Sequence, residues 1–147
     1  MHFQLTSQIF FTVSLSPGAA HGTFLRILTI NDVYSLDHYP SLVTAINQNR
    51  AAAAALDCTF ISTLNGDFLS PCILTSLDGG KGMMDAVSKS GLDYLCLGNH
   101  EFDLIVPALG EKLKDFPGKC LNTNGDVTKM PELAFLPTHD LVGEGSG

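Results

Sequence analysis

A short apolar run ends in a cluster of ionisable residues at positions 92–103, LDYLCLGNHEFD. Its first half is apolar and short, as in the buried strands of a parallel sheet. The turn that follows carries an Asn, a His, a Glu and an Asp within six residues. A cluster of this kind directly behind an apolar strand has no packing rationale, so we expect it to have a functional role.

Strands of similar composition lie upstream, at residues 24–30 and 59–64, and a weaker one covers residues 119–122. The run at 92–97 completes a set of four. Between the strands, longer amphipathic segments predict helices at residues 39–56, 82–90 and 106–116. This alternation predicts an α/β fold with βαβαβ order and a largely parallel sheet.

Polar residues follow each of the three strong strands. Asp32 comes after the first strand, Asp67 after the second, and Asn99 and His100 after the third. In an open parallel sheet the carboxyl ends of the strands lie along one edge, so we expect these side chains to converge there. Carboxylate, amide and imidazole groups suit hard or borderline divalent cations, so the pattern predicts a metal site.

The three turns resemble the first three motifs of the calcineurin-like metallophosphoesterases, with IND at 30–32, NGD at 65–67 and GNHEFD at 98–103. The similarity is greatest to the amino-terminal catalytic domain of the 5′-nucleotidase type. It runs from about Leu25 to Phe116. The resemblance implies a partial four-layered α/β/β/α sandwich over residues 24–136. An N-terminal extension (1–23) and a flexible tail (137–147) would flank it.

The resemblance also implies a role for each motif residue. Asp32 would bind a first metal ion, Asp67 would bridge both ions, and Asn99 would bind the second. His100 would lie beside the phosphate, with Asp103 orienting its imidazole. Two divalent ions, whether Mn, Zn, Fe or Mg, would acidify a shared water so that hydroxide attacks phosphorus. The implied activity is hydrolysis of a phosphate monoester such as a nucleoside monophosphate.

Two departures from the family pattern leave a second hypothesis open. The family has Asp-x-His in its first motif, where this chain has Tyr34, and a phenol is a poorer metal ligand at neutral pH. The family also uses later histidines, a lone His and a Gly-His-x-His pair, and His139 matches neither. We therefore expect either an enzyme completed by the missing half of the domain or a partner chain, or a non-catalytic metal-binding or interaction module.

Charge narrows the choice of partner. The 147 residues include 8 Lys plus Arg and 15 Asp plus Glu, a net charge of −7. The basic residues are scattered, so no basic stripe could neutralise a nucleic-acid backbone. A phosphate ester would need metal cations to approach so acidic a chain. No apolar run reaches the ~18 residues that span a bilayer.

The other sequence features favour structural roles. The four cysteines stand far apart, so we expect buried thiols and slightly favour a reducing, cytoplasmic compartment. Residues 1–23 could be a poor signal peptide, because no Lys or Arg precedes the apolar part, so secretion stays open. The DGGKG at 78–82 lacks the spacing of a phosphate-binding loop and predicts a turn before a helix. Ser62 and Ser70 lack a nucleophile elbow, so serine hydrolysis has no support.

Overall fold

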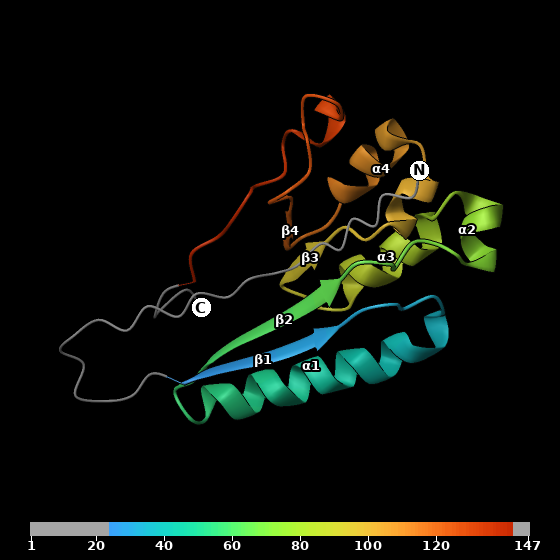
Figure 1. Ribbon diagram of the computed structural model, residues 1–147. Coiled ribbons are helices and arrows are strands. Elements are labelled where there is room, and N and C mark those ends of the chain that lie inside the picture. Colours follow the sequence, from blue (N-terminus) through green and yellow to red (C-terminus); the bar gives the residue numbers. More distant parts are fainter. Residues whose placement is uncertain (1–23, 143–147) are drawn as a thin grey trace.

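A computed structural model describes residues 24–142, and the expected N-terminal extension lies outside this range. These described residues form one four-stranded sheet in which all neighbours are parallel and the strand order follows the sequence (Figure 1). The strands are β1 (Leu25–Ile30), β2 (Thr59–Asn65), β3 (Tyr94–Cys96) and β4 (Lys119–Leu121). The predicted α/β class and the parallel sheet are confirmed.

Helices occupy each crossover between consecutive strands. The α-helices are α1 (Tyr39–Ala54), α2 (Ile73–Asp78), α3 (Lys81–Lys89) and α4 (Val106–Leu113). Three single turns of 3₁₀ helix are η1 (Leu36–His38), η2 (His100–Asp103) and η3 (Pro131–Leu133). A proline stands in the first turn of both α1 and α4, where its missing N–H has no helical partner to lose.

The structure differs from the sequence prediction mainly in lengths. β3 and β4 have three residues each, and α4 ends three residues before the predicted Phe116. The helix α2 was not predicted, because six residues are too few to show a helical period. It ends at Gly79, which adopts the left-handed conformation that glycine favours. The described residues form one sheet, so the implied four-layered arrangement with its second sheet stays a prediction.

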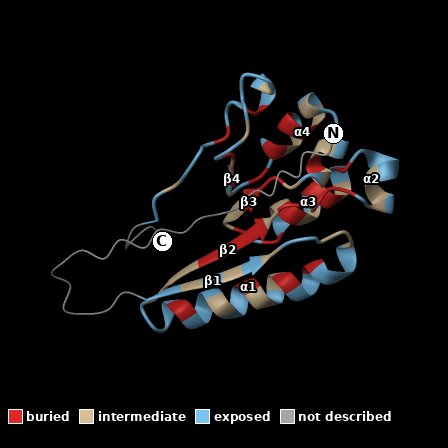
Figure 2. Ribbon diagram, in the orientation of Figure 1, coloured by how far each residue is buried: buried red, intermediate tan, exposed pale blue. Residues whose placement is uncertain are grey.

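The apolar core lies between the sheet and the helices that cover it (Figure 2). Leu64 and Leu95 from β2 and β3 are fully buried against Ile46 of α1 and Met83 of α3. Each such side chain contributes ~1.5–3 kcal/mol through removal of its surface from water. The predicted apolar face of residues 82–90 is therefore a packing surface.

Buried thiols were expected at all four cysteines, and two of the four are buried. Cys96 and Cys120 lie within the sheet, and burial raises the pKa of the Cys96 thiol to about 11. Cys58 and Cys72 are half-buried, which corrects the expectation for those two. Cys58 immediately precedes β2, and Cys72 immediately precedes α2.

Two further features bear on the expectations. Residues 137–142 were assigned to a flexible tail, and within them the side chain of Asp140 forms an ion pair with Lys119 of β4 at 2.7 Å. The tail therefore stays a prediction for residues 143–147, outside the described range.

Across residues 24–142, no helix combines the length and the apolar character needed to cross a bilayer.

Candidate active site

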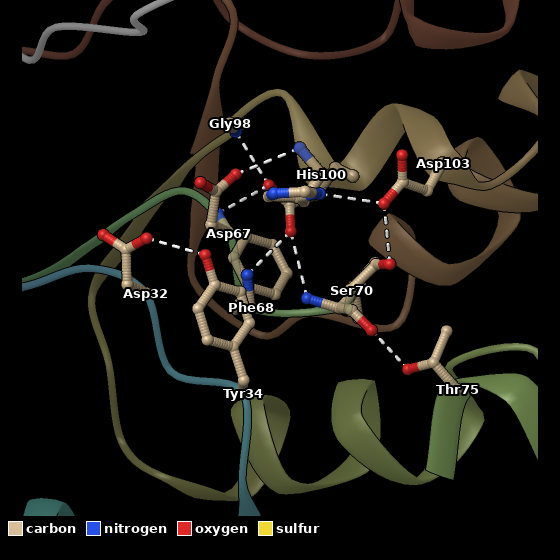
Figure 3. A network of polar contacts seen from close by, with 11 residues as sticks. Asp32, Tyr34, Asp67, Phe68, Ser70, Thr75, Gly98, His100 and Asp103 are labelled. Atoms are coloured by element: carbon tan, nitrogen blue, oxygen red, sulfur yellow. Dashed lines mark hydrogen bonds and ion pairs between the residues drawn. The ribbon is translucent and has the colours of Figure 1, made fainter. Parts of the chain in front are cut away.

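The loops that follow β1, β2 and β3 meet at the carboxyl edge of the sheet (Figure 3). We call residues 31–35, 66–72 and 97–103 the site loops. The N–H of Asp32 donates to the carbonyl of Gly66 at 3.2 Å, which joins the first two loops. A Cβ on Gly66 would lie 2.6 Å from the backbone N of Gly98, so the second and third loops touch through their main chains. The three motifs are therefore neighbours in space.

Two of the predicted metal ligands have unusual backbone conformations. Asp32 and Asp67 both have φ of 59°, in the left-handed region that non-glycine residues seldom adopt. Each is the second residue after the end of its strand. Conformations of this kind cluster at functional sites, where surrounding contacts hold them in place.

The carboxylate of Asp67 faces the third site loop. Its Oδ1 accepts the backbone N–H of His100 at 3.0 Å. The bond leaves the other carboxylate oxygen with acceptor capacity for a cation or a further donor. The contact places the second and third predicted motifs within one hydrogen bond of each other.

A short chain of hydrogen bonds joins the side chains of His100, Asp103 and Ser70. His100 Nδ1 lies 2.9 Å from Asp103 Oδ2, and the same oxygen accepts the hydroxyl of Ser70 at 2.8 Å. The hydrogen bond to Asp103 raises the pKa of His100, with help from the nearby charge of Asp67. The bonds from His100 and Ser70 lower the pKa of Asp103. The predicted pairing of the imidazole with Asp103 is present, and Ser70, which sequence reasoning gave no role, belongs to it.

Tyr34 occupies the place where the family pattern has a histidine. Its hydroxyl donates to Asp32 Oδ1 at 2.7 Å, and the side-chain amide of Asn31 donates to the other oxygen. Burial and the bond to Asp32 raise the pKa of Tyr34, so the phenol stays protonated. Its ring meets that of His100 edge-on, with centroids 6.1 Å apart. Tyr34 is therefore a hydrogen-bond donor to Asp32.

Glu101 is a second site residue to which sequence reasoning gave no role. It is fully buried, and its carboxylate accepts four backbone N–H groups. Oε1 accepts those of Phe68 at 2.7 Å and Leu69 at 3.0 Å. Oε2 accepts those of Asp67 at 2.8 Å and Gly98 at 2.7 Å. The residue type was visible in the motif, but nothing in the sequence shows that this acid points inward.

These four bonds define the charge state of Glu101. Burial raises the pKa of the carboxyl group, and the four N–H donors oppose that rise. A carboxylate has about four acceptor positions, and all are used here. A proton on either oxygen would point at an N–H donor, so the geometry requires the ionised form. Backbone amides replace the cation that usually accompanies a buried charge.

The three predicted metal ligands come from the three site loops. Asp32 and Asp67 offer carboxylate oxygens at one edge, and Asn99 stands exposed at the start of η2. Within residues 24–142, however, no three His, Cys, Asp or Glu side chains come together in a way that could hold a metal ion. The described residues therefore do not form a complete dinuclear site by themselves.

The remaining candidates lie elsewhere or serve the fold. The Asp78 carboxylate accepts the N–H groups of Gly80, Lys81 and Gly82 at 2.7–3.1 Å. A bound phosphate would need these same amides, and the Asp78 carboxylate already occupies them. The turn therefore serves to begin α3. His139 is exposed and bonds the neighbouring Thr138 hydroxyl.

Comparison with known proteins gives the fold a context. No family model matches this sequence, and no curated protein does. Among solved structures, the NAD nucleotidase of Haemophilus influenzae aligns over 68% of this chain with a TM-score of 0.60 and 22% identity. A Staphylococcus aureus protein solved as a candidate 5′-nucleotidase, in complex with alpha-ketoglutarate, aligns over 68% with a TM-score of 0.54 and 20% identity.

These matches identify a class of fold. The chain has the parallel α/β architecture found in the two nucleotidase structures, and the resemblance seen in the three motifs is confirmed at the level of the fold. It covers 20% and 22% of the length of those proteins. At this identity the match speaks for the architecture, and activity has to be argued from the site loops.

Proposed function

We propose that this chain supplies part of the active site of a metal-dependent phosphoesterase that hydrolyses a phosphate monoester, such as a nucleoside monophosphate. The observation that carries the proposal is the joining of His100, Asp103 and Asp67 at the carboxyl edge of a parallel sheet. Two nucleotidase structures share this architecture, which supports the same reaction class.

The proposed role of His100 follows from its hydrogen bonds. Asp103 accepts from Nδ1, which leaves Nε2 as the nitrogen that can exchange a proton with a reacting group. In hydrolysis, a water gives up a proton to solvent as its oxygen bonds to phosphorus, while the bond from phosphorus to the leaving oxygen breaks. Imidazolium at His100 donates its Nε2 proton to that oxygen, and Asp103 stabilises the charged ring beforehand.

The proposed metal ligands are Asp32, Asp67 and Asn99, completed by groups from further polypeptide or a partner chain. Divalent cations bound there would neutralise phosphate charge and acidify a water. This chain's own contribution is to hold two carboxylates, Asp32 and Asp67, at one edge in conformations that the backbone bonds keep in place. The acidic balance of the chain makes such cations necessary for an anionic substrate.

The test is phosphate release by the full chain from a nucleoside monophosphate with Mn²⁺ present. Asp67→Asn and His100→Asn should each abolish it. Asp85→Asn and His139→Asn are matched controls, because both residues are exposed and lie outside the site loops. With 4-nitrophenyl phosphate, whose leaving group needs no protonation, His100→Asn should lose less activity. Activity that survives both site substitutions contradicts the proposal.

A second candidate function is a non-catalytic metal-binding or interaction module. It is favoured by the bond from Tyr34 to Asp32, which occupies one proposed ligand with a neutral donor. Calorimetry with Mn²⁺ separates the two, because an assembled catalytic site should hold two ions and the module one or none. One ion or none, together with no phosphate release, would select the module.

A further inference from the structure

Glu101 is the most buried acid of the site loops and has no place in the proton transfer described above. Its exposed fraction is 0%, and its four acceptor bonds go to main-chain groups. Within residues 24–142, no Lys, Arg or His forms an ion pair with it. Burying a charge is costly unless its hydrogen bonds are complete, so this placement calls for a specific reason.

The donors to Glu101 come from two different loops. Asp67, Phe68 and Leu69 follow β2, whereas Gly98 follows β3. One oxygen, Oε2, accepts from Asp67 and Gly98 together and so joins the loops directly. Figure 3 shows these bonds converging between the labelled Gly98 and Phe68. Glu101 therefore acts as a clasp between the two motifs.

The clasp controls where functional side chains stand. Asp67 is held through its own N–H in the left-handed conformation that redirects its carboxylate. Its Oδ1 in turn accepts from His100, the residue next to Glu101. Contact between the main chains is close enough that a Cβ on Gly66 would overlap Gly98. No other described side chain bonds both loops in this way.

We propose that Glu101 is a positioning residue: its ionised carboxylate holds the backbones of Asp67 and Gly98 together and so sets the position of the Asp67 carboxylate. The metal-binding part of this inference rests on the proposed function, and the geometric part does not. Groups that orient ligands from outside the coordination sphere change metal affinity by roughly 10–100-fold when replaced.

The experiment compares Glu101→Gln with Asp93→Asn in the full chain. Both replace a carboxylate by its isosteric amide, and Asp93 likewise accepts a backbone N–H, that of Ser62 at 2.8 Å. Asp93 lies at the amino end of β3, at the opposite end of the sheet. It therefore controls for loss of stability alone. Glu101→Asp keeps the charge on a side chain one methylene shorter, and serves if the amide variant does not fold.

Two readouts are needed, and the first does not depend on metal. Hydrogen exchange should quicken roughly 10–100-fold at the amides of Asp67, Phe68, Leu69 and Gly98 in Glu101→Gln, the range expected for lost bonds to a charged acceptor. Amides in the ladder between β1 and β2 should keep their protection. Asp93→Asn should leave all four site amides unchanged.

The second readout is Mn²⁺ affinity by calorimetry. It should fall roughly 10–100-fold in the folded Glu101 variants and stay at the parent value in Asp93→Asn. Equal losses in both variants, or unchanged exchange at the four amides, would overturn the positioning role. If the parent chain binds no Mn²⁺, the metal-binding part of the inference fails, and the exchange data alone decide whether Glu101 is a clasp.

Discussion

The two ends of the sheet use carboxylates in different ways. At the amino end of β3, Asp93 accepts the N–H and hydroxyl of Ser62 and forms a 2.8 Å ion pair with Arg50. At the carboxyl end, Asp32, Asp67 and Glu101 have no Lys or Arg within ion-pair distance among the described residues. Asp93 at the amino end is therefore paired with a cation, whereas the three acids at the carboxyl end are not.

The difference separates a structural cluster from a candidate site. A hollow of about 400 Å³ lies at the amino end, lined by Arg50, Asp93 and Lys119 among others, yet its charged groups are already paired. The site loops combine unpaired acids with two left-handed aspartates and an imidazole. Acids without a basic partner beside an imidazole, rather than a cavity, distinguish the functional edge, since Asp57 before β2 also has a left-handed backbone, with φ of 51°.

The largest effect is expected when a glycine at the carboxyl end of the sheet is replaced, compared with a glycine at the amino end. In Gly98→Ala the new Cβ would lie 2.7 Å from the backbone N of Asp67, which Glu101 holds in place. We expect a loss of at least ~3 kcal/mol in unfolding free energy and no phosphate release. Gly91→Ala, at φ of 81° with its nearest atom at 3.8 Å, should cost only ~1–2 kcal/mol and keep activity. Urea unfolding measures both, and equal losses would remove the contrast.

The next largest effect is expected in metal affinity when Tyr34, which stands where the family pattern has a histidine, is replaced. Tyr34→His should raise Zn²⁺ affinity about tenfold, or ~1.4 kcal/mol, because a ligand replaces a neutral donor beside Asp32. Tyr34→Phe removes the hydroxyl without adding a ligand and should gain less. Calorimetry measures both variants. Equal affinities for the two variants would show that position 34 does not face the metal.

The pH dependence of stability should expose the pair of His100 and Asp103. Because the pKa of His100 is raised in the folded protein, protonated His100 stabilises the fold. This stabilisation is complete below about pH 6.5 and is lost as pH rises through the pKa of His100 in the folded protein. Because the pKa of Asp103 is lowered in the folded protein, ionised Asp103 also stabilises the fold. This stabilisation is complete above about pH 4 and is lost as pH falls. The pair therefore stabilises most between these limits.

The variant Asp103→Asn tests that window. Its melting temperature should differ from that of the parent most at about pH 5–6 and converge at pH 9, where neutral imidazole predominates. The effect should be small, because the side chains of His100 and Asp103 are 35% and 52% exposed and solvent screens them. A difference that is the same at every pH would mean that charge is not involved.

The smallest expected effect lies at the amino end. Arg50→Gln breaks an ion pair whose side chains are 45% and 34% exposed, so we expect a change of ~0–1 kcal/mol and unchanged phosphate release. Asp93 keeps its bonds to Ser62 in this variant. Thermal unfolding at low and high salt measures the change. A loss of activity would show that the two ends of the sheet are coupled.

Much of the fold could be predicted because it follows from local chemistry. β1 and β2 begin and end within one residue of their expected bounds, and Pro40 stands in the first turn of α1, where its fixed backbone angle is favoured. The shorter β3 and β4 could not be bounded, since their ends depend on pairing with neighbours. The helix α2 was missed because its short sequence has no period to detect.

The candidate site divides in the same way. The sequence alone determined that polar residues stand behind three apolar strands, because strand pattern and turn chemistry are local properties. Only the tertiary structure decided that Glu101 points inward, that Ser70 joins Asp103, and that Tyr34 bonds Asp32. A buried carboxylate is stable only where amides from distant parts of the chain converge on it, and that convergence exists once the sheet has formed.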